Sequence, residues 1–323
     1  MKIGVVGNGM IVERFLSDIP EVDGANVCSL CVREKSLDKG KALAETYHIP
    51  NVKTNYEEFL ADPEMNAVYI GISNHMHYSY VKQALLAGKH VICEKPFTVH
   101  SWETEELAAL ALEKRLFLWE AFKIPYSPIY QAVRDRLPEL GRIRMVQCNY
   151  SRVSSRYKQY QQGIVLPAFD PEMAGGCLYD INLYNLHFVT GLFGKPEQVI
   201  YHANLGFNGV DTSGIVFLSY PDFPAVCCGA KDSSSPCGAV IQGENGYIRI
   251  EGPASSAKKA LICKDKDEEC FIEFPDNGEL TEELQEFVRQ FLTGDYDSCY
   301  KMLEHSRMMM QVLEQAASSA TSA

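Results

Sequence analysis

The sequence predicts an α/β protein of two domains: a parallel sheet covered by helices, followed by an α+β domain with a large, mostly antiparallel sheet. In the first third of the chain, short β-branched runs that are apolar throughout alternate with helical patterns, which is typical of parallel strands buried on both faces. Later runs alternate apolar and polar residues, as strands with one buried face do. The length of 323 residues suits two domains, which we place at 1–121 and 122–323.

The first domain is expected to alternate strands and helices from its first residues onward. The expected strands are 2–7, 26–32, 67–72, 90–96 and 116–121. A glycine turn and a helix follow the first strand, and further helical patterns lie at 37–48, 78–88 and 101–115. In these patterns apolar residues recur at helical spacing, so each helix can cover the sheet with one face.

The second domain is expected to hold a series of strands and then two helices. Clusters of Gly, Pro, Asp and Ser separate the alternating runs, as turns do. The expected strands are 144–153, 198–207, 214–220, 225–230, 239–244, 246–252, 259–264 and 270–274. Helical patterns over 281–294 and 298–317 come last, and the small polar tail at 318–323 is expected to fray.

The composition disfavours several classes of protein. The formal net charge is −12, and such an acidic surface repels phosphate backbones and anionic membranes, so neither nucleic acid nor membrane is an expected partner. The odd count of 11 cysteines is not a disulfide scaffold, and the pair Cys28 and Cys31 lacks a second ligand pair at zinc spacing. We therefore expect reduced cysteines, no metal and, without a secretory signal or a long apolar run, a cytoplasmic protein.

The turn after the first strand carries two glycines. It reads Gly7, Asn8, Gly9, Met10, Ile11, and it leads into a helix. Glycines there let the chain turn tightly and let backbone amides approach a pyrophosphate, so the motif predicts a dinucleotide-binding Rossmann domain. Val12 occupies the third glycine position of the usual fingerprint, and a plain tight turn remains the alternative.

The end of the second strand bears on the choice of cofactor. An acid at this place bonds the ribose 2′-hydroxyl of NAD(H), whereas an arginine accepts the 2′-phosphate of NADP(H). Here Val32 takes the place of the acid, and Arg33 follows it. The pattern favours NADP(H), with NAD(H) possible. The alternative is that Arg33 is a charged residue in a solvated turn.

The strand at 90–96 ends in Glu94, Lys95 and Pro96. In open parallel sheets, ligands bind beyond the carboxyl ends of the strands. Proline fixes the backbone and stops the ladder, so Lys95 is aimed at a defined angle. A lysine at such a place can orient a hydroxyl or carbonyl and carry a proton, although an ordinary solvated lysine is as good an interpretation of the residues alone.

A helix after Gly175 and Gly176 carries Asp180, Tyr184 and His187. The spacing i, i+4, i+7 places the three side chains on one face of an α-helix. An acid, a phenol and an imidazole together can handle protons. The alternative is a wet helix face whose tyrosine and histidine are half-buried and hydrogen-bonded.

Together these stretches resemble the Gfo/Idh/MocA family, named after glucose-fructose oxidoreductase, inositol dehydrogenase and rhizopine catabolism. The Glu-Lys-Pro signature stands at 94–96, the fourth-strand loop at 71–85, and the Gly-Gly-to-Asp segment at 167–184. The resemblance implies a Rossmann domain plus an open-faced α/β domain. It also implies hydride exchange between a nicotinamide and a sugar, polyol or related carbonyl compound.

Site residues follow from the resemblance position by position. Lys95 is the implied catalytic lysine and Asp180 the implied helix acid. Tyr184 stands where many members have histidine, which resembles the subgroup containing glucose-fructose oxidoreductase and dimeric dihydrodiol dehydrogenase, where tyrosine is the proposed acid/base. The implied cofactor contacts are Gly7, Asn8, Gly9, Met10, Ile11, Arg33, Ser73, Asn74, His77, Glu94 and Lys95. Pro125 replaces an arginine that is common in the family.

The resulting hypothesis is an NADP(H)-preferring dehydrogenase or reductase acting on a secondary alcohol or ketone of a sugar, polyol or cyclic diol. Tyr184 is the favoured acid/base, Asp180 tunes Lys95 or the substrate hydroxyl, and His187 is a secondary candidate. Lys95 as the acid/base is the mechanistic rival. Specificity is expected from loops near 126–131, 152–168 and 231–237. A homodimer or homotetramer through the second-domain sheet is expected, and a catalytically silent NAD(P)-binding regulator or sensor is the competing class.

Overall fold

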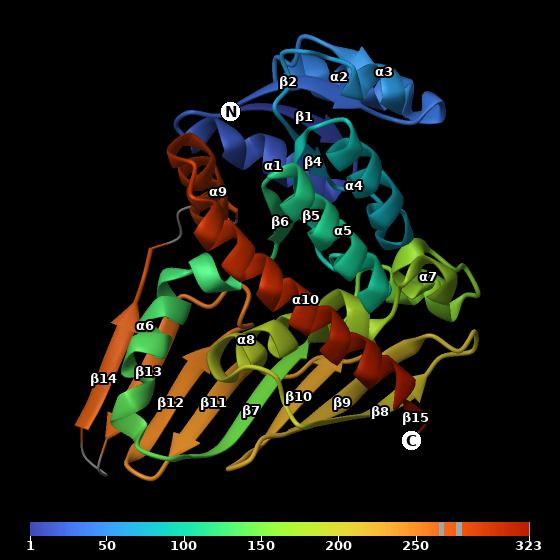
Figure 1. Ribbon diagram of the computed structural model, residues 1–323. Coiled ribbons are helices and arrows are strands. Elements are labelled where there is room, and N and C mark those ends of the chain that lie inside the picture. The colour runs from blue at the N-terminus through green and yellow to red at the C-terminus, as the bar shows by residue number, and fades with distance from the viewer. Residues whose placement is uncertain (265–267, 276–279, 323) are drawn as a thin grey trace. The chain divides into compact units, whose positions relative to one another are not determined.

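The computed structural model of the protein describes residues 1–264, 268–275 and 280–322 (Figure 1). Its chain forms two compact units. Among the described residues, 1–121 and 280–307 form the first unit, and the others form the second. The first change of unit thus falls between Ala121 and Phe122. The prediction had placed everything after 121 in the second domain, whereas a late segment of the chain belongs to the first unit.

The first unit is built on a parallel sheet with the strand order β3-β2-β1-β4-β5-β6. The strands are β1 (Lys2–Val6), β2 (Asn26–Cys31), β3 (Val52–Lys53), β4 (Ala67–Ile70), β5 (His90–Glu94) and β6 (Leu118–Ala121). The helices between them are α1 (Met10–Asp18), α2 (Leu37–Thr46), α3 (Tyr56–Leu60), α4 (His77–Leu86) and α5 (Ser101–Lys114). The order reverses between β1 and β4, which is the switch point where such sheets bind nucleotides.

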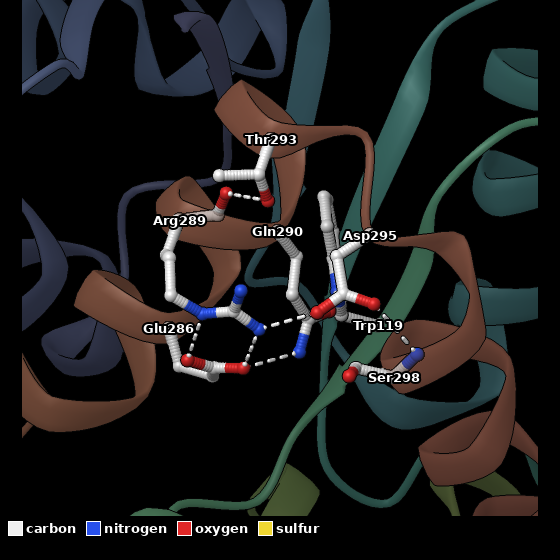
Figure 2. A network of polar contacts seen from close by, with 7 residues as sticks. All are labelled: Trp119, Glu286, Arg289, Gln290, Thr293, Asp295 and Ser298. Atoms are coloured by element: carbon white, nitrogen blue, oxygen red, sulfur yellow. Dashed lines mark hydrogen bonds and ion pairs between the residues drawn. The ribbon is translucent and has the colours of Figure 1, made fainter.

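The late segment is α9 (Thr281–Thr293) with the first part of α10 (Tyr296–Ser318). One of its contacts with the first unit is made by a tryptophan of β6, whose buried indole N–H needs an acceptor. Trp119 is 2% exposed, and its Nε1 donates to Oε1 of Gln290 at 2.7 Å. Figure 2 shows the network around this bond, in which Arg289 bridges Glu286 and Asp295. The sequence predicted both helices but not their place.

The second unit holds a large sheet with the strand order β14-β13-β12-β11-β7-β10-β9-β8-β15. Its pairs are antiparallel except β7 with β10 and β8 with β15. The strands are β7 (Ile143–Ser151), β8 (Gln198–Leu205), β9 (Asp211–Ser219), β10 (Pro224–Ala230), β11 (Gly238–Gly243), β12 (Gly246–Glu251), β13 (Lys259–Lys264), β14 (Glu268–Glu273) and β15 (Thr321–Ser322). The expected mostly antiparallel sheet is confirmed.

One face of this sheet is covered by helices α6 (Pro128–Arg136) and α8 (Leu183–Phe193) (Figure 1). The short helix α7 (Tyr157–Gln161) precedes α8 in the chain. Burial alternates along the strands, as the sequence pattern predicted: Val216 and Leu218 of β9 are buried, while Ile215 and Phe217 between and beside them are 39% and 42% exposed. The two faces of the sheet therefore have different surroundings.

The structure of the C-terminal tail differs from the sequence prediction. Residues 321–322 form β15, which pairs with His202 and Ala203 of β8, whereas the sequence predicted fraying. Thr321 Oγ1 lies 2.8 Å from Nδ1 of His202, and the hydroxyl of Ser319 accepts the backbone N–H of Tyr201. The small polar residues that suggested a loose end are the groups that bond to this strand.

Candidate active site

The glycine turn has the geometry that the motif predicted. Gly7 has φ of +115°, and a Cβ there would lie 2.3 Å from the carbonyl oxygen of Gly71. Only glycine fits a position with that dihedral and that neighbour. Val12, which departs from the fingerprint, is buried, and a Cβ on Gly71 would lie 2.8 Å from its methyl group. The glycine at 71 thus makes the room that the larger residue at 12 needs.

The N-terminus of α1 suits a pyrophosphate. Gly9 is the N-cap residue, and among the described residues no side chain caps the first turn. The amides of that turn are therefore left for an anion, and the helix dipole favours one. Met10 and Ile11 begin the helix with side chains 68% and 36% exposed. These residues fit a dinucleotide, with Asn8 completing the turn.

Lys39 on α2 was not identified from the sequence. Its Nζ donates to the carbonyl oxygen of Asn8 at 2.7 Å and forms an ion pair with Glu13 at 2.8 Å. The lysine therefore braces the glycine turn against the first turn of α1. Its position in a mixed, exposed helix pattern gave no signal for this contact.

Arg33 lies two residues after the end of β2 and is exposed, as are Glu34 and Lys35. It is the N-cap residue of a short 3₁₀ helix, Glu34–Ser36, with extended backbone. Val32, at the place of the NAD-binding acid, is buried. The structure thus leaves the Arg33 guanidinium open to solvent at the carboxyl end of β2, which is where a 2′-phosphate lies in folds of this type.

The loop after β4 contains the predicted contacts Ser73, Asn74 and His77. Ser73 and Asn74 are half-buried at a short 3₁₀ helix, Asn74–Met76. His77 is fully buried, with Nδ1 2.8 Å from the carbonyl oxygen of Pro96 and Nε2 3.2 Å from that of Ile72. Burial lowers the pKa of His77. Its imidazole therefore ties two loops together, and the predicted cofactor contact of His77 stays a prediction.

Glu94, at the end of β5, is also held by hydrogen bonds. It is 6% exposed, and its carboxylate accepts the hydroxyl of Tyr69 at 2.7 Å and the backbone N–H of Lys95 at 3.3 Å. It thus fixes the end of β5 to β4. The next residue, Lys95, is half-buried and precedes Pro96 through a cis peptide bond. The strand end therefore presents Lys95 from a turn that is held on both sides.

Glu120 on β6 holds this turn, and sequence reasoning missed this residue. It is 3% exposed, Oε1 accepts the backbone N–H of Phe97 at 3.2 Å, and Oε2 accepts the hydroxyl of Ser306 on α10 at 2.6 Å. An acid at the end of a buried strand was visible at 116–121. Its partners come from distant parts of the chain, so the pattern could not reveal the contact.

In the second unit, Asp211 organises the start of the predicted proton-handling helix. Its Oδ2 accepts the backbone N–H of Leu178 at 2.7 Å and the hydroxyl of Tyr201 at 2.6 Å. Gly176 has φ of +109°, and a Cβ there would lie 2.0 Å from Oδ1 of Asp211. Burial raises the pKa of Asp211 to about 6. Gly176 is thus needed so that this carboxylate can approach the helix.

The helix begins with a π turn, Leu178–Asn182, before α8. Asn182 and Asn185 fasten it to β10 by donating to the carbonyl oxygens of Cys227 and Cys228 at 3.0 Å and 2.8 Å. Gly229 allows this close approach, since a Cβ there would lie 2.7 Å from that of Asn182. The wider turn changes the register on which the single-face prediction relied.

The three predicted side chains consequently differ in their surroundings. The side chain of Asp180 is 39% exposed and Tyr184 is half-buried, with its ring 6.0 Å from that of Tyr150. His187 is 1% exposed and stacks on Phe122 at 4.3 Å between ring centroids. Asp180 and Tyr184 therefore remain accessible, whereas His187 is part of the packed interior rather than of an open face.

Asp180 has a charged partner that the sequence did not reveal. Its Oδ2 lies 2.8 Å from Nζ of Lys231, whose side chain is 2% exposed. Lys231 follows β10, at the start of a loop predicted to carry specificity. The prediction that Asp180 tunes Lys95 or the substrate must therefore include this second lysine.

Comparison with known proteins gives the family. The model described as "Oxidoreductase family, NAD-binding Rossmann fold" (GFO_IDH_MocA) matches residues 1–122, and the GFO/IDH/MocA C-terminal domain model matches residues 130–249. The chain is 30% identical over 317 residues to scyllo-inositol 2-dehydrogenase (NADP(+)) IolU of Bacillus subtilis (strain 168), covering 98% of this chain and 96% of that protein. This chain belongs to the GFO/IDH/MocA oxidoreductase family.

The chain is also similar to a second curated protein and to a solved structure. Trans-1,2-dihydrobenzene-1,2-diol dehydrogenase of Xenopus tropicalis is 30% identical over 98% of this chain and 96% of its own. KijD10, a 3-ketoreductase from Actinomadura kijaniata solved with NADP, has a TM-score of 0.85 at 22% identity, covering 100% of this chain and 98% of its own. The predicted fold and an NAD(P)-binding Rossmann domain are therefore confirmed. Among the described residues, no helix has both the length and the apolar character to span a membrane.

Proposed function

We propose that this family member is an NADP(H)-preferring enzyme that moves a hydride between nicotinamide and a secondary alcohol or ketone of a sugar, polyol or cyclic diol. Each unit contributes one observation to the proposal. The nucleotide-binding unit presents Lys95 at a carboxyl strand end, and the second unit presents Asp180 and Tyr184 on one helix. The similarity to an inositol dehydrogenase and to dihydrodiol dehydrogenases supports the substrate class.

The cofactor would be held by groups of the first unit. Amides at Gly9, Met10 and Ile11 would bind the pyrophosphate, and Arg33 would bind the 2′-phosphate. Ser73 and Asn74 would lie on the nicotinamide side. His77 and Glu94 would act indirectly, through the loops that they fasten.

When bound, the nicotinamide supplies or accepts the hydride. In the reductive direction the Tyr184 hydroxyl donates its proton to the oxygen of the carbonyl and becomes a phenolate, and in the oxidative direction that phenolate accepts the proton of the substrate hydroxyl. A tyrosine has an ordinary pKa of about 10, so this role needs a neighbouring cation, which the proposal assigns to Lys95. The rival assignment makes Lys95 the proton donor and Tyr184 a binding group.

The reaction is tested with scyllo-inositol, related polyols and trans-dihydrodiols in an NADP⁺-linked assay. Tyr184→Phe is expected to lower kcat at least about 100-fold, because general acid–base catalysis contributes at least that factor. Tyr150→Phe is the matched control, since it removes a hydroxyl from the neighbouring ring. If Tyr184→Phe keeps full activity and Lys95→Met abolishes it, the rival assignment is correct. Nucleotide binding without turnover of any substrate favours the silent regulator instead.

The cofactor preference is tested by fluorescence titration of NADPH and NADH. Arg33→Ala is expected to weaken NADPH about tenfold or more, the cost of losing one charge-assisted hydrogen bond, and to leave NADH unchanged. Lys41→Ala is the control, because this lysine is an exposed cation of α2. Equal effects of the two variants on NADPH would show that only general charge matters.

We also propose a homo-oligomer formed through the open face of the second-unit sheet. Ile200 of β8 and Phe217 of β9 are directly opposite each other, at 44% and 42% exposure. Exposed apolar pairs of this kind are typical of surfaces that a partner covers. Sedimentation should give a dimer or tetramer, and Phe217→Glu should dissociate it.

We propose that the protein is cytoplasmic on the evidence of its cysteines. All eleven lie within the described residues, and each is a free thiol. Thiols persist in a reducing compartment.

A further inference from the structure

Lys231 is a buried cation whose amine uses all of its donors. Nζ donates to the carbonyl oxygen of Ala168 at 2.6 Å and to that of Gly176 at 3.2 Å, and it forms the ion pair with Asp180 at 2.8 Å. It also lies 4.5 Å from the ring centroid of Phe169. An ammonium group has three N–H donors, so its hydrogen-bonding capacity is filled. The lysine thus connects the loop before the helix to the first acid on it.

The backbone of Lys231 is fixed as well. Its N–H donates to the carbonyl oxygen of Thr212 on β9, and its own carbonyl oxygen accepts the N–H of Ser154, both at 2.8 Å. The side chain therefore starts from a rigid point on the sheet and ends at Asp180. A side chain that is fixed at both ends in this way determines where the carboxylate can lie.

The ion pair adds little to stability, but it orients the Asp180 carboxylate. A buried lysine pays a large desolvation penalty, and an apolar residue of the same volume often gives equal or higher stability. Asp180 does not need the lysine for solvation, because 39% of its side chain is exposed to water. What the lysine adds is a fixed direction for the carboxylate and a positive charge beside it.

We infer that Lys231 is a positioning residue for the proposed reaction, which holds the Asp180 carboxylate in one orientation on the helix that carries Tyr184. The inference rests on the proposed function. The ionisable groups around the pair are Asp211, whose carboxylate binds the start of the helix, Asp232 in the loop after β10, and the thiol of Cys177. Asp232 is engaged by the hydroxyls of Thr212 and Ser213, so Asp180 is the carboxylate directed by the lysine.

The experiment compares Lys231→Met, Asp180→Asn and the double variant. The control is Lys195→Met, a lysine at the surface of the same unit whose Nζ donates to Gln311. Activity is measured across pH with the substrate found for the wild type, and urea unfolding is measured for every variant. Lys231→Gln is the second choice if the methionine variant does not fold, since it removes the charge but keeps N–H donors.

Lys231→Met is expected to lower kcat roughly 100-fold, as a displacement of about 1 Å at an active site does, with NADPH affinity unchanged. The double variant should be no slower than Asp180→Asn alone, because the lysine acts through that carboxylate. The acidic limb of the kcat profile should move to higher pH in Lys231→Met, because Asp180 loses its cation. A merely structural lysine would lower the unfolding midpoint without moving that limb.

Failure of this inference can be distinguished from failure of the proposed function. A wild-type enzyme that turns over while Lys231→Met keeps kcat within about threefold, well short of the effect of a 1 Å displacement, overturns the inference alone. Additive losses in the double variant also overturn it. A wild-type protein that binds NADPH and turns over no alcohol or ketone refutes the proposed function, and the role of Lys231 falls with it.

Discussion

Asp211 is expected to make the protein less stable as the pH rises. Its pKa is about 6 in the folded protein, because burial disfavours the charged form, and its ordinary value is 3.8. A raised folded pKa means that the folded protein binds this proton more tightly than the unfolded chain does. The stabilisation from this group is therefore complete below about pH 3.8, and it is lost as the pH rises through about 6.

The size of the effect follows from the two pKa values. Linkage gives a loss of about 1 kcal/mol at pH 4.5 and about 3 kcal/mol at pH 7, relative to the protonated group. These are upper figures, because part of the Asp211 residue remains accessible to solvent although its Oδ2 is enclosed by Leu178 and Tyr201. Even half of the effect is a measurable fraction of the roughly 5–15 kcal/mol that stabilises an ordinary domain.

Asp211→Asn isolates this contribution. Both hydrogen bonds to the carboxylate end on the same oxygen, so the amide oxygen of asparagine can accept both while the charge is removed. The variant is expected to be more stable than the wild type at pH 7, with the difference shrinking to about 1 kcal/mol at pH 4.5. Urea unfolding of both proteins across this range measures the difference, in which the titration of all other groups cancels. A difference that stays constant or grows toward acid pH would refute the reasoning.

Two further predictions concern packing. Gly229→Ala places a methyl group 2.7 Å from the Cβ of Asn182, so the helix must move, and urea unfolding should show a loss of about 1–3 kcal/mol. A variant as stable as the wild type would mean that the helix yields without cost. Gln290→Leu leaves the buried indole N–H of Trp119 without its acceptor and should also cost about 1–3 kcal/mol. In the double variant with Trp119→Phe the loss should be smaller than the sum of the two single losses, and additive losses would show that the bond itself matters little.

Most of the framework could be predicted from local patterns, because those patterns are set by burial on one or both faces. Continuous apolar runs such as 90–96 predicted the strands of the parallel sheet, and the alternation of apolar and polar residues predicted those of the second unit. The two-residue strand β3 (Val52–Lys53) lacked enough residues to show any pattern. The fraying expected at 318–323 was wrong for residues 318–322, because the partners of that tail, in β8, lie more than 100 residues away, and residue 323 lies outside the described residues.

A residue of the candidate site could be predicted only where its neighbours in the sequence are distinctive. Lys95 stands between a strand and a proline, and Asp180 follows a glycine pair, so both are visible in the sequence. The roles of three further residues depend on contacts with groups that are distant in the chain, so the local sequence does not show them. These residues are Lys231, Glu120 and Lys39. The π turn at 178–182 misled the prediction for His187, since helical spacing assumes an uninterrupted α-helix.

The late segment that completes the first unit has a consequence for how the chain folds. Asp18 accepts the backbone N–H of Leu280 across 262 residues, and Trp119 meets Gln290 across 171. During synthesis, residues 1–121 leave the ribosome long before α9 exists, and contacts so distant in sequence are slow to form. The nascent nucleotide-binding sheet must therefore wait with the indole of Trp119 uncovered until nearly all of the other unit has been made. A fragment ending at Ala121 would keep that surface open permanently, so the two units are inseparable as products of a single polypeptide even though each has its own core.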